Sequence, residues 1–230
     1  MIQILKSVFL LGVASSALAH IHSGNQIPFS DPRFTLNGIP FSTRAYWMRR
    51  ANEALPNPCP FAAFGTVIVN HTGNPGLGEL ICTGSNNNSA TGNPTLHGEI
   101  SAINNCTTIL TSPAGPYRLT PSQASAAFTS LTLYTNAESC PMCASAIRWA
   151  GFREYVYGTS IPTLIEKGWG QIRIVSAEVF QQSFELPNPS RLLGEVLTNE
   201  TDPLFSWQFD PDFLCPAGCE RLGGRCQSLP

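Results

Sequence analysis

The sequence predicts one α/β domain of three layers, with helices on both faces of a β-sheet. Five β-rich segments alternate with segments of helical periodicity along the middle of the chain. Such alternation is typical of a sheet that is covered by helices on both sides. A chain of 230 residues is also long enough for one domain with a sizeable core plus terminal extensions.

The first half of this domain is expected to contain a helix, a hairpin and a second helix. Residues 44–55 form the first helix, because prolines end it at positions 56 and 58. Residues 62–69 and 79–83 form a hairpin, since a turn rich in Gly, Asn and Pro separates them. Residues 97–110 carry apolar side chains at helical spacing and form the second helix.

In the second half, residues 112–125 are rich in Pro, Gly and Ser and are expected to be a connector. Residues 141–151 are expected to form a helix that begins with a proline at its first position. The remaining expected elements are strands at 131–135, 154–158 and 171–175 and a short helix at 162–167.

The two ends of the chain differ from this middle part. Residues 1–19 are expected to be a secretory signal peptide, with a short apolar run followed by an Ala-x-Ala cleavage site at Ala19. The run is too short to span a bilayer, so no membrane partner is expected. We divide the rest into an extended arm at 20–43, the folded domain at 44–185 and a Cys-containing tail at 186–230.

Composition narrows the choice of partner. Charged residues make up 12% of the chain, its net charge is −2, and its Lys and Arg residues form no stripe. Binding to nucleic acid is therefore not expected. Four N-glycosylation sequons begin at Asn70, Asn87, Asn105 and Asn199, and they suggest a glycoprotein. Asn70 and Asn199 are the better candidates, because they lie in loop-like surroundings that are polar or rich in Pro and Gly. A glycan on Asn87 would hinder access to the expected pocket.

Eight cysteines are typical of a secreted chain. If Cys140 and Cys143 hold a metal, six cysteines remain, three in the domain and three in the tail: Cys59, Cys82, Cys106, Cys215, Cys219 and Cys226. Sequence alone leaves their fifteen pairings open. Complete pairing nevertheless requires an odd number of domain-to-tail bridges, so at least one disulfide should join the tail to the domain.

Two short motifs carry the chemistry, His97-Gly98-Glu99 and Cys140-Pro141-Met142-Cys143. One imidazole and two thiolates can hold Zn²⁺ and leave a fourth position open for water. Cys140 and Cys143 share one face of a first helical turn, where the helix dipole favours thiolates. Positions two apart on a helix point in nearly opposite directions, so His97 must lie where its helix begins. Glu99 is then the base.

Other readings of the same residues remain open. A Cys-x-x-Cys motif in a secreted chain is often a disulfide or a redox pair. A closed structural zinc site would need a fourth ligand, but His71 falls in an expected turn and Cys106 lies far along its helix from His97. We therefore expect a catalytic zinc site rather than a structural one.

Several segments together resemble the cytidine deaminase-like superfamily, and they are most similar to guanine deaminases and tRNA adenosine deaminases. They lie within residues 44–175, at 64–69, 84–86, 93–99, 133–135 and 138–143. The chain departs from the family pattern at Ser139, where proline is usual, and this change is expected to loosen the approach to Cys140. The resemblance implies a three-layer α/β/α fold with a mixed five-stranded sheet, bound Zn²⁺, ammonia release and homodimers.

The resemblance also assigns roles to residues. It implies that His97, Cys140 and Cys143 are the zinc ligands, that Glu99 moves protons and that Asn86 binds a base. Asn86 can alternatively be a turn-forming residue. Trp149 is expected either to stack on the base as a wall of the pocket or to be a core residue. The tail aromatics Phe205, Trp207, Phe209 and Phe213 either shield the pocket mouth or cover hydrophobic surface on the far side of the sheet.

These features favour a secreted zinc-dependent hydrolase, a deaminase of a free nucleobase or nucleoside with a guanine-like purine preferred. The alternative is a secreted binding or effector protein that has kept a deaminase fold without turnover, since a fold does not fix a function.

Overall fold

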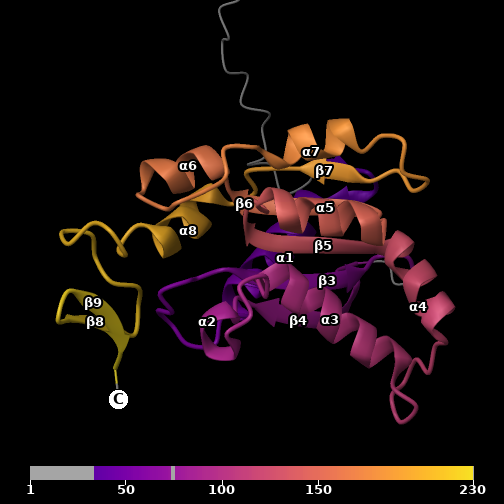
Figure 1. Cartoon of the computed structure of the whole chain (residues 1–230), viewed down its shortest axis with the longest axis horizontal. Coiled ribbons are helices and arrows are strands. Elements are labelled where there is room, and N and C mark those ends of the chain that lie inside the picture. The colour runs from indigo at the N-terminus through magenta and orange to yellow at the C-terminus, as the bar shows by residue number, and fades with distance from the viewer. Residues whose placement is uncertain (1–33, 74–75, 230) are drawn as a thin grey trace, which may run out of the picture.

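The computed structural model of the chain describes residues 34–73 and 76–229. The expected signal peptide and most of the expected arm lie outside the described residues. A sheet of order β4-β3-β5-β6-β7 forms the centre of the molecule (Figure 1). Its strands are β3 (Gly65–Asn70), β4 (Glu79–Ser85), β5 (Leu131–Ala137), β6 (Glu154–Thr159) and β7 (Arg191–Leu193). The expected three-layer α/β class with a mixed five-stranded sheet is confirmed.

Strand direction changes once across this sheet. β3 pairs antiparallel with both β4 and β5, whereas β5, β6 and β7 run parallel. The expected hairpin is therefore the β3–β4 pair, in which Ile68 pairs with Cys82 and the register shifts between Ile68 and Val69. The parallel strands β5 and β6 are each followed by a helix at the same end of the sheet, which brings loops together there.

The core consists of two apolar layers because alternate residues of each strand point to opposite faces. On one face, the sheet packs against helix α1 (Phe41–Glu53), whose buried residues include Trp47 and Met48. On the other face, it packs against α3 (Gly98–Thr111) and α5 (Pro141–Ala150). Neighbouring residues of β3 show this alternation: Val67 and Val69 belong to the first layer and Ile68 to the second.

The expected helices α1, α3, α5 and α6 (Ile161–Glu166) are present, with ends shifted by a few residues. Among the helices that the sequence analysis did not expect, the two longest are α4 (Pro121–Ala127) and α7 (Ser176–Gln182). The connector assigned to 112–125 is thus wrong at its end. A capping box between Thr120 and Gln123, with a proline after Thr120, begins α4 and is the local pattern that we missed.

The strand expected at 171–175 is wrong. This segment forms no strand, and its two isoleucines, Ile172 and Ile174, are exposed by 59% and 38%. The fifth strand is instead β7, which pairs with β6 from within the segment assigned to the tail. Alternating apolar residues indicate a possible strand pairing, but only the tertiary structure decides which segment reaches the open edge.

The tail continues through α8 (Thr198–Thr201) and η2 (Asp202–Phe205) to a hairpin of β8 (Cys219–Leu222) and β9 (Arg225–Ser228). This hairpin lies at one end of the molecule, and α4 lies at the other (Figure 1). Three disulfides are present, Cys82–Cys106, Cys215–Cys226 and Cys59–Cys219. The last one joins the domain to the tail and confirms the parity argument.

Four short elements complete the described chain: β1 (Thr35–Leu36), β2 (Ile39–Pro40), α2 (Asn88–Thr91) and η1 (Phe128–Ser130). Within residues 34–73 and 76–229, no helix has the length and apolar character needed to cross a bilayer.

Candidate active site

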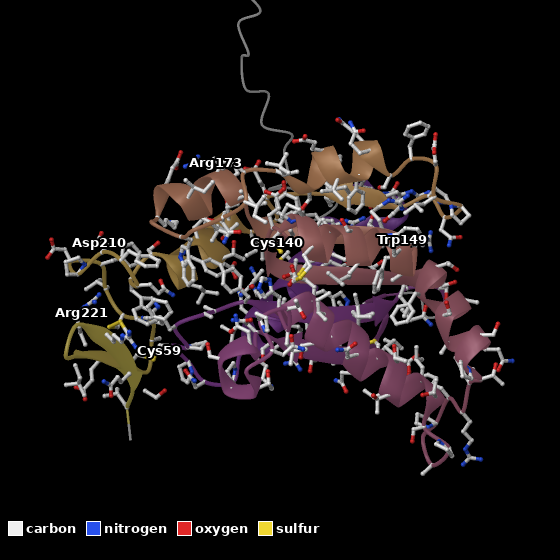
Figure 2. All side chains as sticks on the ribbon, in the orientation of Figure 1. Cys59, Cys140, Trp149, Arg173, Asp210 and Arg221 are labelled. Carbon is white, nitrogen blue, oxygen red and sulfur yellow. A yellow bond between two sulfur atoms is a disulfide. The ribbon has the colours of Figure 1, made fainter. Side chains whose placement is uncertain are left out.

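The two sequence motifs meet at the starts of two helices. His97 immediately precedes α3, and Cys140 immediately precedes α5, with Cys143 in its first turn. Nδ1 of His97 lies 3.6 Å from Sγ of Cys140 and 3.7 Å from Sγ of Cys143. All three ligand atoms lie within 4.8 Å of one another, so a single metal ion can contact all of them. Cys140 lies near the middle of the molecule (Figure 2).

Local sequence explains these positions. His97 has extended backbone angles, φ −71° and ψ 168°, so its side chain points differently from those of the helix that follows. Gly98 lies against β3, where an added Cβ would come within 2.8 Å of the Phe64 carbonyl oxygen. Pro141 occupies the first turn of α5, where proline favours the start of a helix, so Cys140 becomes the N-cap residue of this helix. The expected helix-start positions of His97 and Cys140 are confirmed.

The protonation of the cluster suits a divalent cation. Hydrogen bonding from Cys143, with a further contribution from His97, lowers the pKa of Cys140 to about 4. The neighbouring Cys140 sulfur, together with burial, raises the pKa of Cys143. Cys140 and Cys143 would hold a metal ion as thiolates, because metal binding releases their protons. Two thiolates and one imidazole form the soft, nitrogen-and-sulfur donor set that Zn²⁺ prefers.

Glu99 lies beside this cluster in the first turn of α3 and is only 5% exposed. Burial raises the pKa of Glu99, and the Cys140 thiolate adds to the effect. The carboxyl group therefore lies in a desolvated site, where it can exchange protons with a bound molecule rather than with bulk water.

A cavity of about 330 Å³ opens onto the cluster. Its wall combines the metal cluster residues His97 and Cys140, carboxyl groups, amides and aromatic rings; the side chains that matter below are Glu99, Asn86, Asn88, Gln171, Phe61, Phe64 and Trp169. Its volume is at the small end of the range for small-molecule sites, about 300–1,000 Å³.

Asn86 lies where the resemblance implied, in the cavity wall directly after β4. Its backbone N–H donates to the carbonyl oxygen of Phe64 at 2.9 Å, which fixes the loop. Its amide nitrogen donates to Oδ1 of Asn88 at 3.3 Å, while its own Oδ1 is buried and has no partner among the described residues. A buried unpaired acceptor in a cavity wall is suited to bind a donor group of a ligand.

Glu138 also borders the cavity, although sequence reasoning did not single it out. Both of its carboxylate oxygens are occupied, because they accept the backbone N–H groups of Ile161 at 2.8 Å and Ser176 at 2.7 Å. Glu138 thus ties the starts of α6 and α7 to the strand end that leads into Cys140. We assign it a structural role in positioning this loop.

Ser139 does not loosen the approach to Cys140 as expected. Its backbone N–H, which a proline would lack, donates to the Tyr155 hydroxyl at 2.7 Å. Its carbonyl oxygen accepts the Ser176 hydroxyl at 3.1 Å. These two hydrogen bonds hold the segment in place in the way that a rigid proline ring would.

The two expected positions for Trp149 are both wrong. Trp149 is 76% exposed and lies toward the end of α5, away from Cys140 (Figure 2). It neither lines the cavity nor belongs to the core. Its position nine residues after Cys140, near the other end of a ten-residue helix, separates it from the site.

The tail aromatics were expected either to shield the pocket mouth or to cover hydrophobic surface on the far side of the sheet, and they do not line the cavity. None of Phe205, Trp207, Phe209 and Phe213 borders the cavity. The aromatic wall consists instead of Phe61, Phe64 and Trp169, which sequence reasoning missed. Trp169 stands between two glycines in a Gly-Trp-Gly segment, and this pattern of a large ring in a flexible loop was the available signal.

An α/β fold that brings a His-Cys-Cys cluster and a buried glutamate into one small cavity defines a metal-binding hydrolase-like class of protein. A family model described as the cytidine and deoxycytidylate deaminase zinc-binding region matches residues 42–159. The chain belongs to this family, as the resemblance of its motifs predicted.

Two relatives are guanine deaminases. The enzyme from Bacillus subtilis (strain 168) is 29% identical over 145 residues, which cover 63% of this chain and 79% of that protein. A structure of guanine deaminase from Nitrosomonas europaea superposes with a TM-score of 0.50 at 17% identity, covering 70% of this chain and 81% of the other. A tRNA:A34 deaminase structure superposes with a TM-score of 0.44 at 21% identity, covering 66% and 98%.

Proposed function

We propose that the protein is a secreted, zinc-dependent hydrolytic deaminase of a free nucleobase or nucleoside, with a guanine-like purine as the preferred substrate. The observation that carries this proposal is that His97, Cys140 and Cys143 meet beside a small cavity that the buried carboxyl group of Glu99 also borders. Family membership and the guanine deaminase relatives support the same reaction class.

Each group in the site has a part in this reaction. His97, Cys140 and Cys143 would hold Zn²⁺, which as a Lewis acid lowers the pKa of water at its open position. Glu99 accepts one proton from the attacking water and delivers it to a ring nitrogen, and then transfers the remaining proton of the added hydroxyl to the departing amine. The C–N bond of the amidine-type carbon breaks, an oxygen from water replaces the nitrogen, and ammonia leaves.

The cavity wall favours an uncharged, planar heterocycle. Amides of Asn86, Asn88 and Gln171 can donate to and accept from the edge of a base. Phe61, Phe64 and Trp169 supply ring faces for stacking. Among the described residues, neither Lys nor Arg borders the cavity, so a substrate phosphate would find no cationic partner there.

The decisive test is Glu99→Gln. We expect this variant to keep about one zinc per chain and to lose ammonia release from every base by at least about a hundredfold, because one proton-transfer group contributes about 10²–10⁴-fold. Purified zinc-loaded protein is assayed with guanine, adenine, cytosine, their nucleosides and pterins, and zinc is measured by atomic emission.

Glu185→Gln is the matched control, since Glu185 is an exposed carboxylate distant in sequence from both motifs. It should keep full activity. Unchanged turnover in Glu99→Gln would exclude the proposed role of the carboxyl group. Full zinc content with no ammonia from any substrate, combined with tight binding of a ligand, would favour the alternative of a binding protein on a deaminase fold.

Secretion, glycosylation and dimer formation are further parts of the proposal. Three disulfides support an oxidising compartment. Asn70 and Asn199 remain the preferred glycan sites. The exposed ring of Trp149 is of the kind that subunit interfaces bury. Protein recovered from the culture medium should begin at His20, lose mass on glycosidase treatment and elute as a homodimer. A different N-terminus, an unchanged mass or a monomeric elution would reject secretion, glycosylation or dimer formation respectively, and would leave the proposed reaction unaffected.

A further inference from the structure

One short tail segment connects the two loops that carry the aromatic wall of the cavity. We call residues 205–209 the bridge. The first loop, residues 59–64, carries Phe61 and Phe64, and the second, residues 167–171, carries Trp169. The rings of Phe61 and Trp169 contact each other, with centroids 5.7 Å apart. The bridge comes after the segment that the family model matches, which ends at residue 159.

The bridge holds the Trp169 loop at three consecutive residues. Nζ of Lys167 donates to the Ser206 hydroxyl at 2.7 Å, and Nε1 of Trp169 donates to the Phe205 carbonyl oxygen at 2.9 Å. Between them, the Phe209 side chain lies so close to Gly168 that an added Cβ there would be 3.0 Å away. The indole ring of Trp169 is therefore fixed through both its nitrogen and its backbone.

The same segment holds the Phe61 loop. Nε2 of Gln208 donates to the Phe61 carbonyl oxygen at 3.0 Å. The Phe61 ring meets the edges of Trp207 and Phe209 at centroid distances of 6.0 Å and 5.8 Å. The Phe209 ring also contacts the Trp169 ring, with centroids 5.3 Å apart, so one side chain contacts the aromatic rings of both loops.

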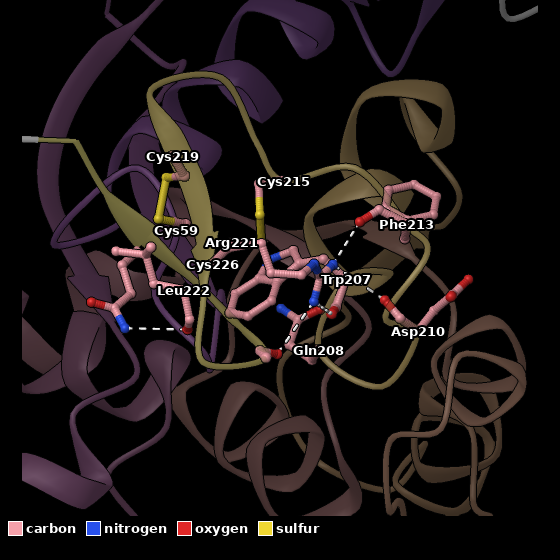
Figure 3. Close-up of a disulfide and its surroundings, with 12 residues drawn as sticks. Cys59, Trp207, Gln208, Asp210, Phe213, Cys215, Cys219, Arg221, Leu222 and Cys226 are labelled. Carbon is pink, nitrogen blue, oxygen red and sulfur yellow. Dashed lines mark hydrogen bonds between the residues drawn. A yellow bond between two sulfur atoms is a disulfide. The ribbon is translucent and has the colours of Figure 1, made fainter.

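Covalent bonds and hydrogen bonds keep the bridge in place (Figure 3). Cys59, two residues before Phe61, is joined to Cys219. Trp207 is 2% exposed and packs in one cluster with Cys59 and Cys226. The guanidinium group of Arg221 donates to the carbonyl oxygens of Phe213 at 2.6 Å and Asp210 at 3.3 Å, which closes the loop that follows the bridge.

We propose that the bridge is a positioning element that sets the separation and tilt of Phe61 and Trp169 and thereby determines which bases the cavity accepts. This inference rests on the proposed function, because it takes the substrate to occupy this cavity. No hydrogen bond within the described part of the chain joins the bridge to Glu99 or to the three candidate ligands. Changes in the bridge therefore act on substrate binding and leave zinc binding and the chemical step in place.

The test is Phe209→Ala, which removes the ring that touches both walls from a site that is 50% exposed. We expect KM for the preferred base to rise about tenfold, since two aromatic pairs are lost, while kcat changes less than about twofold and zinc stays near one per chain. Leu214→Ala is the control, because Leu214 lies in the same tail and is 84% exposed. It should match the wild type.

Two further measurements separate positioning from general damage. In the inactive Glu99→Gln background, the Kd of guanine should also rise about tenfold on adding Phe209→Ala. The effect should be smaller when Trp169→Leu is already present, because two changes that act through a shared contact are not additive and only the contact of Phe209 with Phe61 remains. An unchanged KM and Kd, a fall confined to kcat, or additive effects would each overturn the proposal.

A readout without substrate distinguishes this proposal from the proposed function. Acrylamide quenching of Trp169, isolated by subtracting the signal of Trp169→Phe, should increase in Phe209→Ala. Increased quenching together with no turnover or guanine binding in the wild type would reject the function and retain the positioning of the wall. Unchanged quenching would reject the positioning role itself.

Discussion

At the residue scale, Asn86 differs from its neighbours Asn87 and Asn88 in the hydrogen bonding and burial of its side-chain oxygen. Asn87 is exposed, and Asn88 accepts a hydrogen bond from Asn86. Oδ1 of Asn86 is buried and unpaired among the described residues. An unpaired buried polar atom costs about 1–3 kcal/mol of stability, and a ligand that pairs with it recovers this energy on binding.

Asn86→Ala should therefore weaken catalysis without weakening the fold. Loss of this hydrogen-bonding amide is expected to lower kcat/KM about 10–100-fold for the preferred base. The free energy of unfolding should not fall, because the orphan acceptor is removed. Steady-state kinetics and urea unfolding check both parts, with Asn104→Ala on the exposed side of α3 as control. A loss smaller than twofold would remove Asn86 from the binding site.

His71 makes a pH-dependent contribution to stability, remote from the metal cluster. Its Nε2 lies 3.0 Å from the Tyr134 hydroxyl. Burial, followed by the positive charge of Arg44, lowers the pKa of His71 to about 4. The unfolded chain then takes up a proton on this ring near pH 6.5, whereas the folded chain resists it. This contribution is fully present above about pH 6.5 and is lost as the pH falls toward 4.

His71→Gln should therefore reduce the acid sensitivity of the protein and retain the Asn70 sequon. Urea unfolding of both proteins at pH 7.5 and pH 5.0 measures the effect. The difference in stability between wild type and variant should shift in favour of the variant at the lower pH. An equal difference at both pH values would show that His71 does not titrate between them.

At the element scale, α1 is docked to the sheet by a buried ion pair. Arg44 of α1 and Glu154 of β6 are 1% and 2% exposed, and Nη2 of Arg44 lies 3.1 Å from Oε1 of Glu154. Nη2 of Arg44 also donates to the Leu36 carbonyl oxygen at 2.9 Å, and Asn37 donates to Glu154 at 2.9 Å. One pair of charges thus joins the β1–β2 segment, α1 and the sheet.

Arg44→Met should destabilise the fold by about 3–5 kcal/mol, because it leaves the Glu154 carboxylate buried without its partner. Replacing both residues, Arg44→Met with Glu154→Met, should cost less than the single change, since no buried charge remains. Urea unfolding at pH 7.5 gives the two values. If the double variant is the less stable one, the pair itself contributes net stability and our assignment of the loss to an unpaired charge fails.

The elements also show what sequence can and cannot predict. The starts of α3 and α5 were predictable, because the geometry of a shared metal requires His97 and Cys140 to precede their helices. β7 was not, since three residues at a sheet edge carry no pattern that distinguishes them from residues 171–175. Trp149 was misplaced for a related reason: an aromatic residue on an amphipathic helix suggests burial, whereas its exposed face depends on what packs beside the helix.

At the scale of the whole molecule, the described chain consists of a family domain with a disulfide-linked tail. The sequence predicted that a disulfide would join the two, because parity requires it. It could not predict that the tail meets Phe61 and Trp169, since neither pairing nor packing of aromatic rings follows from counting cysteines. The tail crosses back to a segment 160 residues earlier through Cys59–Cys219.

This separation predicts how much each tail disulfide stabilises the fold. By loop-closure entropy, Cys59–Cys219 should contribute about 5 kcal/mol and Cys215–Cys226 about 3 kcal/mol, since they span 160 and 11 residues. The paired alanine variants, Cys59→Ala with Cys219→Ala and Cys215→Ala with Cys226→Ala, are compared by urea unfolding. Equal losses would mean that local packing, and not loop length, sets the contribution.

The long span of Cys59–Cys219 also determines when, during synthesis, the loop that carries Phe61 can be joined to the tail. At about 5–20 residues per second, Cys219 is synthesised on the order of 10–30 s after Cys59, and both Cys82 and Cys106 arrive in between. A nascent chain can thus gather its metal ligands while the sulfur beside Phe61 is still unbonded. Until Cys219 has been made, Cys59 cannot form its native disulfide, so the Phe61 loop is joined to the tail only near the end of synthesis.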